Sequence, residues 1–330
     1  MKYRTLGNTG LEVSVICQGC WSIVGGQTWG NQDRDDSIAA IRTAMDAGIN
    51  FFDTAPAYGD GESEQLIAAA FDGSPARHDA VIATKINRED AAPSDVRASC
   101  EHSLQRLGVE TIDLLQLHWP NPDIPAEETI GAMMQLRAEG KIRAVGVSNF
   151  GVGYLADLPE GVVATNQIAY SLLWRVPERE VIPACRRRGI SILCYSPICQ
   201  GLLAGKFDSP DAVPDGRART RLFSKDRPEA RHHEAGCEAE TFEAIAKIRG
   251  ICEDIRQPMS RVALAWLIAR EGVTAAIAGG RNPDQARDNA AAGDLELPPE
   301  VIEALEAAGR SVLDALDDNC DMWQTDSRMG

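Results

Sequence analysis

Four residues suited to proton transfer lie at or near the ends of apolar segments. Asp53 ends FFD, Lys85 ends VIATK, His118 follows IDLLQL, and Tyr58 comes five residues after Asp53. A lysine ammonium near a tyrosine stabilises the phenolate and lowers the pKa of the phenol, and an aspartate keeps that lysine charged. A histidine can orient a substrate oxygen. The set predicts proton transfer to an oxygen whose carbon receives a hydride, or the reverse reaction on an alcohol.

Apolar segments typical of buried strands recur along the chain and would position these residues. They begin near Val15, Asn50, Val81, Ile112, Arg143, Val163, Ser191 and Thr274. Most are separated by segments with apolar residues at three- and four-residue spacing, which indicates amphipathic helices, with Ser94 and Pro125 as predicted starts of two of them. Eight such units favour a closed (β/α)8 barrel over an open doubly wound sheet, as one domain over residues 1–330. The active site of such a barrel lies at the carboxyl ends of its strands.

Three segments fall outside this repeat. Residues 1–13 contain two short strand-like pieces around GNTG, which predicts a β-hairpin that could plug the bottom of the barrel. A polar loop at about 208–234 follows the seventh strand, and we expect it to cover a bound cofactor. Two helices follow that loop. The polar C-terminal tail, at about 312–330 with Trp323, is compatible with either a frayed end or a flap.

Composition and charge exclude several classes of protein. The net charge of −16 argues against a nucleic-acid interface, and no apolar run is long enough for a membrane span. The N-terminus has no apolar core typical of a signal peptide. Nine cysteines without an export signal indicate reduced thiols in the cytoplasm. CQGC, at Cys17 to Cys20, has no second ligand pair at zinc spacing, so no metal site is expected.

Several motifs together resemble the aldo-keto reductase superfamily. They are FFDTAPAYGDGESEQLI, VIATK, IDLLQLHW and GKIRAVGVSNF, while GGQTWGNQDRDDSIAAI and CYSPICQGLLAGKF are most similar to its bacterial branch of stress-related and inositol-related reductases. The resemblance runs from the first hairpin to about Leu316. It implies a catalytic tetrad of Asp53, Tyr58, Lys85 and His118, with Tyr58 as general acid/base and NADP(H) as cofactor.

The residues that could hold a dinucleotide lie across the same barrel end. No G-x-G-x-x-G follows the first strand, and GLLAGK is one residue short of a phosphate-binding P-loop, so neither a Rossmann site nor an NTPase is indicated. Side-chain amides could bind a nicotinamide carboxamide, and Tyr195 could stack on its ring. Backbone N–H groups of Gly201 and Leu202, with Lys206, could bind a pyrophosphate. The expected cofactor residues are Gly19, Cys20, Trp21, Ser148, Asn149, Gln167, Tyr195, Ser196, Pro197, Gly201, Leu202, Lys206, Gly279, Arg281, Gln285 and Asn289.

The expected preference for NADP over NAD depends on Arg281. It precedes a helix that begins at Pro283, and a guanidinium can bind a 2′-phosphate in forked geometry. The resemblance places Gln285, Asp288 and Asn289 around the adenosine. Gly279 and Gly280 stand where the fullest phosphate patterns have polar residues, so NAD stays the alternative.

Aromatic residues predict the substrate walls. Trp21, Trp29 and Trp119 lie in or near the loops above the strand ends, with Trp174 as a further candidate. Such walls suit sugars and apolar carbonyls equally, and the expected substrate is a small carbonyl or alcohol. The basic run 186–188 and the histidines at 232–233 are expected on the surface. Two other functions fit the same motifs. One is an NAD(P)-dependent sugar or polyol (inositol-type) dehydrogenase working in the oxidative direction, and the other is a regulatory oxidoreductase resembling a channel β-subunit.

Overall fold

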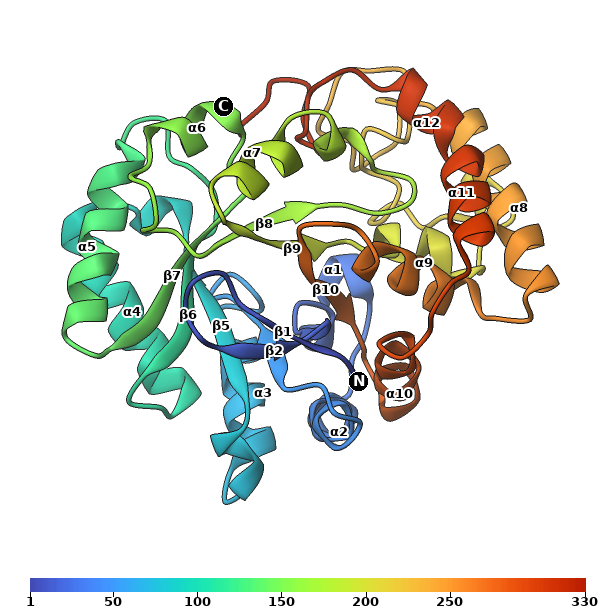
Figure 1. Cartoon of the computed structure of the whole chain (residues 1–330). Coiled ribbons are helices and arrows are strands. Elements are labelled where there is room, and N and C mark those ends of the chain that lie inside the picture. The colour runs from blue at the N-terminus through green and yellow to red at the C-terminus, as the bar shows by residue number, and fades with distance from the viewer.

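The computed structural model describes all 330 residues, and its centre is a closed barrel of eight parallel strands (Figure 1). Strands pair with their neighbours in chain order, and β10 closes the ring by pairing with both β9 and β3. The barrel strands are β3 (Ile16–Gly19), β4 (Phe51–Asp53), β5 (Val81–Ile86), β6 (Ile112–Leu117), β7 (Ile142–Ser148), β8 (Thr165–Ala169), β9 (Ser191–Tyr195) and β10 (Val273–Gly279). Because each predicted strand start lies within two residues of an observed one, the predicted (β/α)8 barrel is confirmed.

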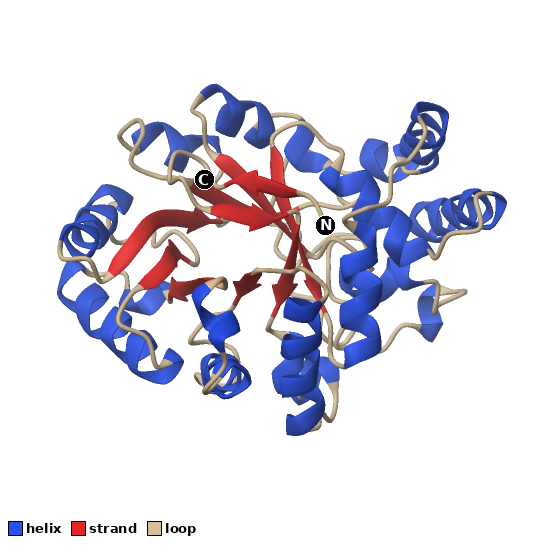
Figure 2. Ribbon diagram, turned by 60° about the horizontal axis from the view of Figure 1, so that its bottom comes forward, coloured by secondary structure: helices blue, strands red, loops and turns tan.

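Helices surround the strands, as Figure 2 shows. They are α1 (Gly26–Trp29), α2 (Arg34–Asp46), α3 (Glu62–Phe71), α4 (Pro93–Leu107), α5 (Ala126–Ala138), α6 (Val152–Asp157), α7 (Val181–Arg187), α8 (Glu238–Asp254), α9 (Met259–Ile268), α10 (Pro283–Ala292), α11 (Pro299–Ala308) and α12 (Arg310–Ala315). The predicted cap at Ser94 is wrong, because α4 begins one residue earlier at Pro93 and has no side-chain cap. Proline suits the first helical position because it has no N–H to leave unpaired there.

The N-terminal hairpin seals one end of the barrel. Strands β1 (Tyr3–Thr5) and β2 (Glu12–Ser14) pair in antiparallel fashion, as predicted. Leu6, Leu11 and Val13 of this hairpin are buried in the same small apolar cluster as the inward-facing barrel residues, including Phe51 and Leu114. The interior is therefore a packed core at this end, and the opposite end, where the strands finish, is left for the site.

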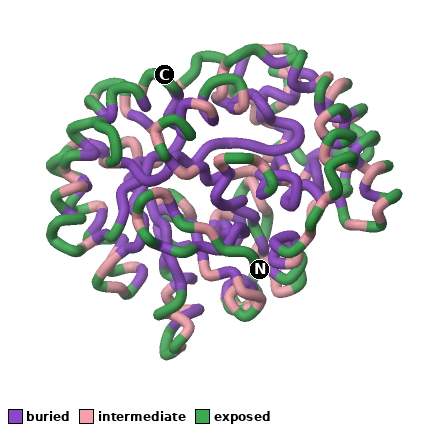
Figure 3. Tube along the Cα trace, viewed as in Figure 1, coloured by how far each residue is buried: buried purple, intermediate pink, exposed green.

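The larger apolar core lies between the strands and their helices. Buried residues follow the strands through the middle of the molecule, and exposed residues lie along the outer helices and loops (Figure 3). Leu115 of β6 and Val145 of β7 belong to this outer core, whereas the residues before them, Leu114 and Ala144, belong to the interior cluster. The parallel strands are thus apolar on both faces, which accounts for their near-continuous apolar sequence.

Two segments after the seventh strand fold over the carboxyl ends of the barrel. The loop 208–234 precedes α8, and the tail 317–330 runs from α12 across the barrel to its end beside α6 (Figure 1). The N–H of Arg221 donates to the carbonyl of Met322, and the N–H of Gly151 donates to the carbonyl of Met329. Met322 and Met329 are buried, so this tail is packed against the barrel and not frayed. No helix of the chain combines the length and the apolar character needed to cross a bilayer.

Candidate active site

The barrel register brings the charged residues of two neighbouring strands together. Asp53 is the last residue of β4, and Lys85 is the penultimate residue of β5, the next strand. The Lys85 ammonium donates to Asp53 Oδ1 at 2.7 Å, to the Thr54 carbonyl at 2.8 Å and to the Tyr58 hydroxyl at 3.3 Å. Lys85 is fully buried, so its charge is balanced by Asp53 inside the protein and not by water.

The turn after β4 holds Tyr58 above this pair. Gly59 and Gly61 have φ angles of 63° and 88°, and a Cβ at Gly61 would lie only 2.5 Å from Arg106 Cδ. Glycine is therefore needed where the chain bends from Tyr58 into α3. The Tyr58 ring packs edge-to-face against His118, with ring centroids 5.9 Å apart.

Burial and charge set the protonation of these groups. Burial lowers the pKa of Lys85, but Asp53 and Tyr58 together raise it by more than burial lowers it, so the net shift is upward. Burial and the charge of Lys85 lower the pKa of His118 well below its usual range, and the ring is neutral at neutral pH. Burial raises the pKa of Tyr58, the Lys85 charge lowers it, and the net shift is upward. The expectation of a lowered tyrosine pKa is wrong here, because the loss of hydration outweighs the lysine.

The second oxygen of Asp53 is held by two amides. Gln167 Nε2 donates to Asp53 Oδ2 at 2.7 Å, and Gln116 Nε2 does so at 3.4 Å. Gln167 was predicted to bind the cofactor, and Gln116 was not predicted. A glutamine inside the apolar run IDLLQL was the available signal, because a buried polar side chain needs a partner. Both amides fix the orientation of the carboxylate that holds Lys85.

One cavity of about 830 Å³ opens above these residues at the carboxyl ends of the strands. The predicted site residues contribute to its lining with three exceptions: Lys85, which lies buried beneath it, and Leu202 and Trp174, whose side chains are buried in the core. The predicted residues in its lining are Gly19, Cys20, Trp21, Trp29, Asp53, Tyr58, His118, Trp119, Ser148, Asn149, Gln167, Tyr195, Ser196, Pro197, Gly201, Lys206, Gly279, Arg281, Gln285 and Asn289.

Several predicted amides already have partners within the chain. Asn149, with a φ of 62°, donates from Nδ2 to the His118 carbonyl at 3.1 Å and accepts at Oδ1 from the Tyr195 hydroxyl at 2.9 Å. Ser148 Oγ donates to the Gln167 carbonyl. Gln200, which was not predicted, has no such partner. It lines the cavity and is buried, and neither its amide nitrogen nor its amide oxygen has a partner. A ligand with matching polar groups would satisfy that amide.

Arg281 is bound by loop carbonyls and forms no ion pair with a carboxylate. It donates to the Trp29 carbonyl at 2.8 Å and to Gln32 Oε1 at 2.7 Å, so it fastens the loop around α1 to the end of β10. Asp33 and Asp36 lie in the same polar hollow as Arg281. The helix that follows, α10, is capped by Asn282, whose side chain accepts from the Gln285 N–H.

The loop 208–234 and the tail complete the wall of the cavity. Arg217, Arg219, Trp323 and Arg328 line it, and none of them was predicted. The guanidinium of Arg328 lies 3.8 Å from the centre of the Trp119 ring. These residues were missed because their segments have no periodic pattern that indicates their position.

Three other sequence predictions are corrected or refined by the structure. Trp174 is fully buried, with the Arg221 guanidinium 5.7 Å from its ring, and it does not line the cavity. His232 is buried, and its Nε2 lies 3.1 Å from the Thr220 carbonyl, so only His233 of that pair is on the surface. Arg188 is half-buried, and its guanidinium donates to two backbone carbonyls. The structure holds no group of three His, Cys, Asp or Glu side chains arranged to bind a metal ion.

The fold and the site define a class of enzyme, a (β/α)8 barrel with a tyrosine, a lysine, an aspartate and a histidine at one cavity. Comparison with known proteins identifies the family. Residues 15–310 match the model of the Aldo/keto reductase family. The NADH-specific methylglyoxal reductase of Escherichia coli (strain K12) is 32% identical over 337 residues, which cover 93% of this chain and 100% of that protein. The chain belongs to the aldo/keto reductase family and is an oxidoreductase.

Solved structures agree with this assignment. The glycerol dehydrogenase of Gluconobacter oxydans superposes with a TM-score of 0.81 at 29% identity, covering 96% of this chain and 97% of that one. An aldo/keto reductase from Klebsiella pneumoniae, solved in complex with NADP and acetate, gives a TM-score of 0.73 at 28% identity, covering 93% and 95% of the two chains. The likeness therefore extends over the whole barrel and not only its motifs.

Proposed function

We propose that this protein is an NADP(H)-dependent aldo-keto reductase that interconverts an aldehyde or ketone and the corresponding alcohol, with Tyr58 as general acid/base. The observation that carries the proposal is the Tyr58 hydroxyl, 3.3 Å from a buried lysine ammonium and at the floor of the cavity. The nicotinamide cofactor would supply a hydride to the carbonyl carbon or accept one from the alcohol carbon. The residues below provide the proton and the positions of the reacting groups.

Each residue of the tetrad has a separate task. The Tyr58 hydroxyl donates a proton to the carbonyl oxygen during reduction, and its raised pKa keeps it protonated at neutral pH. The Lys85 ammonium stabilises the phenolate that remains, and Asp53 holds that ammonium in place. Neutral His118, whose ring has no hydrogen bond within the chain, can donate an N–H to the substrate oxygen. In the oxidative direction the same tyrosine accepts the alcohol proton.

The residues present fit a dinucleotide. The unpartnered amide of Gln200 and the buried, unpartnered Nε of Arg217 line the same cavity, and both are groups that a carboxamide or phosphate can satisfy. We propose that Gly201, Leu202 and Lys206 hold the pyrophosphate through N–H groups and charge, and that Tyr195 supports the nicotinamide ring. We propose that the other residues of the predicted cofactor set contact the rest of the dinucleotide.

We propose NADP(H) as the preferred cofactor. Arg281 forms no ion pair with a carboxylate, and the N–H groups that its loop contacts leave free could bind a 2′-phosphate. The rival is NAD(H), because Asp33 and Asp36 face the same hollow and would repel that phosphate. The Escherichia coli relative is named as NADH-specific, and the Klebsiella pneumoniae neighbour holds NADP.

We also assign the chain to the bacterial branch of stress-related and inositol-related reductases and to the cytoplasm. The branch rests on the motif resemblance around residues 25–41 and 194–207. The compartment is supported by the nine cysteines, all free and eight of them buried, since such thiols persist in a reducing environment. Polyol oxidation is the second candidate function, favoured by the structural likeness to a glycerol dehydrogenase.

Cofactor binding and turnover test this function together. Titration of NADPH and NADH separately, followed by tryptophan fluorescence, should give tight binding of at least one dinucleotide, with NADPH preferred. Arg281→Gln should weaken NADPH binding and leave NADH binding nearly unchanged. Turnover of a panel of aldehydes and polyols then shows whether the enzyme works in the reductive or the oxidative direction. No binding of either dinucleotide would refute the proposed function, and equal effects of Arg281→Gln on both would remove Arg281 from the 2′-phosphate site.

A further inference from the structure

The charge at the cavity is opposite to the charge of the whole chain. The chain carries a net charge of −16, yet the cavity is lined by cations that have no carboxylate oxygen within 4 Å. We call these five residues the mouth cations: Lys206, Arg217, Arg219, Arg231 and Arg281. Arg328 is not among them because it is paired with Asp321. Unpaired cations gathered at one opening favour anionic ligands.

A dinucleotide accounts for the mouth cations on one side of the cavity. Lys206 follows Gly201, and an Arg217 nitrogen would lie 3.5 Å from a Cβ at Gly201. The charge of Arg281 lowers the pKa of Arg217, so these two cations lie close to each other. Arg217 lies 5.5 Å from the Trp29 ring centre and Arg281 donates to the Trp29 carbonyl, so these two form one group. Lys206 lines the same cavity and was assigned above, with Gly201, to the cofactor phosphates.

Arg219 lies against a different ring from Arg217, on the Trp21 that packs on Tyr58 and not on Trp29. Its guanidinium carbon is 5.6 Å from the Trp21 ring centre and 5.0 Å from that of Trp323. Trp21 stacks on Tyr58, with centroids 6.0 Å apart and ring planes at 26°, and Trp323 Nε1 donates to the Tyr195 hydroxyl. A single indole thus separates Arg219 from the proposed proton donor.

The guanidinium of Arg219 has no hydrogen-bond partner in the chain, and its Nε is buried. The charges that face it are Arg231 and Glu229, which have opposite signs, and Glu229 is more than 4 Å away. Two indole rings restrict the side chain, so little conformational freedom is left to lose when it binds a ligand. A planar guanidinium with free N–H groups matches the two oxygens of a carboxylate or a phosphate.

We propose that Arg219 binds an anionic group of the substrate, so that the substrate is a carbonyl compound or alcohol that carries a carboxylate or phosphate. This inference rests on the proposed function, because it names the substrate class of the same site. The anion lies at Arg219, between Trp21 and Trp323, and the carbonyl oxygen lies at Tyr58. Arg219 is thus a specificity-determining residue, distinct from the cations on the cofactor side.

Matched pairs of aldehydes that differ by one anionic group test the proposal. Suitable pairs are 4-oxobutanoate with butanal, and glyceraldehyde 3-phosphate with glyceraldehyde. For the wild type we expect kcat/KM to be at least tenfold higher for the charged member of a pair. Which pair shows the larger ratio distinguishes a carboxylate from a phosphate. The Arg219→Gln variant should bring the ratio close to one, whereas Arg219→Lys should retain part of it because the charge remains.

A matched control removes one positive charge far from the cavity. Arg187 is exposed, lies at the end of α7 and has no carboxylate partner, so Arg187→Gln should keep the wild-type ratio. Cofactor affinity is measured for every variant. A wild-type ratio of one or less, with good turnover of the uncharged aldehydes, would overturn this proposal and leave the proposed function standing. Weaker cofactor binding by Arg219→Gln with an unchanged ratio would also overturn it. Turnover of none of the four aldehydes would instead count against the proposed function.

Discussion

At the scale of single residues, the proposed mechanism depends on a buried pair of opposite charges. The side chains of Lys85 and Asp53 are 0% and 3% exposed, and Gln116 and Gln167 hold the second carboxylate oxygen. A buried pair of this kind adds little net stability, but removing one partner leaves an uncompensated charge. The pair places a cation beside the Tyr58 hydroxyl, and this role in catalysis accounts for a buried pair that adds little stability.

Neutralising the aspartate should therefore damage both stability and activity. We expect Asp53→Asn to lower the free energy of unfolding by about 3–5 kcal/mol, measured by denaturant titration, and to lower kcat strongly. Glu243→Gln, which breaks the exposed pair of Glu243 with Lys247, is the control and should change stability little. An Asp53→Asn protein as stable as this control would show that the buried pair is not needed to compensate Lys85.

The lowered pKa of His118 predicts how stability depends on pH. The folded protein holds this ring neutral, while the unfolded chain protonates it below about pH 6.5. The unfolded state therefore binds more protons as pH falls from 6.5 towards the folded pKa, and stability is lost over that window. We expect the free energy of unfolding of His118→Gln to fall less steeply than that of the wild type between about pH 7 and pH 5. Identical slopes would mean that His118 has the same pKa in both states.

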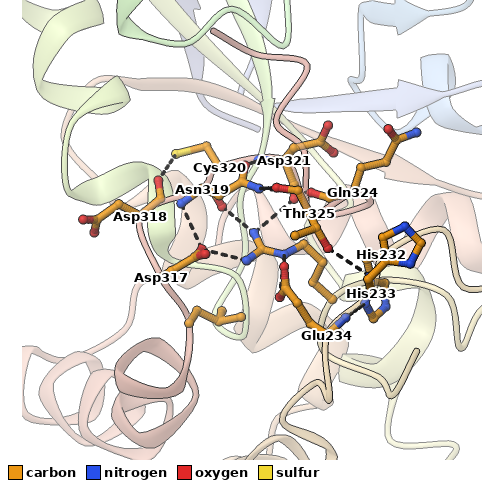
Figure 4. Close-up of polar contacts among 12 residues, drawn as sticks. His232, His233, Glu234, Asp317, Asp318, Asn319, Cys320, Asp321, Gln324 and Thr325 are labelled. Carbon is orange, nitrogen blue, oxygen red and sulfur yellow. Dashed lines mark hydrogen bonds and ion pairs between the residues drawn. The ribbon is translucent and has the colours of Figure 1, made fainter. Parts of the chain in front are cut away.

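At the scale of elements, the loop 208–234 and the tail form one polar assembly over the barrel. Arg221, 1% exposed, donates to Glu234 in the loop and to Asp317 and the Asn319 carbonyl in the tail. Figure 4 shows Glu234 and His233 of the loop beside the tail, where the N–H of His233 donates to Thr325 Oγ1. This assembly places Arg219 and Trp323, one from each segment, on the same side of the cavity.

Removing this contact should loosen both segments without affecting the barrel. We expect Arg221→Met to speed hydrogen exchange of amides in residues 230–236 and 317–325 by about tenfold, with the barrel strands unchanged. Arg227→Met is the matched control, because Arg227 pairs with Glu238 and Asp211 and makes no contact with the tail. Unchanged exchange in the tail of Arg221→Met would show that the apolar contacts of Met322 and Met329 alone hold it.

The sequence was sufficient to predict the barrel but not this assembly. Apolar runs that end in a polar residue located Asp53, Lys85 and His118, since a parallel strand is apolar throughout and its carboxyl end is the functional edge. The tail has no such periodicity, and it is ordered by Arg221, nearly a hundred residues earlier in the chain. His232 likewise belongs to a polar stretch, and its burial depends on contacts that the stretch does not reveal, with the Thr220 carbonyl at Nε2 and the Glu234 N–H at Nδ1.

The direction of the Tyr58 pKa shift could not be predicted from residue types alone. The nearby lysine lowers the pKa and burial raises it, and the balance depends on how much water reaches the hydroxyl. Gln116 was missed for a related reason, because its role depends on the strand register that places it beside Asp53.

At the scale of the whole molecule, charge is distributed unevenly. The net charge of −16 repels an anionic dinucleotide at long range, and three of the mouth cations, Lys206, Arg217 and Arg281, attract it at short range. Because these cations are partly exposed, we expect the Kd of the dinucleotide to rise by about tenfold when NaCl increases from about 0.05 M to about 0.5 M. Arg217→Gln should show a weaker dependence on salt. A Kd independent of salt would contradict a role for the mouth cations in binding.

The Tyr58→Phe variant shows whether Tyr58 transfers the proton. The variant keeps the ring that stacks on Trp21 and loses only the hydroxyl 3.3 Å from Lys85. We predict that its dinucleotide Kd stays within about threefold of the wild type, while kcat for carbonyl reduction falls by about 10²–10⁴. Tyr154→Phe, at a tyrosine outside the cavity, should change neither quantity. Retention of wild-type kcat by Tyr58→Phe would contradict the mechanism.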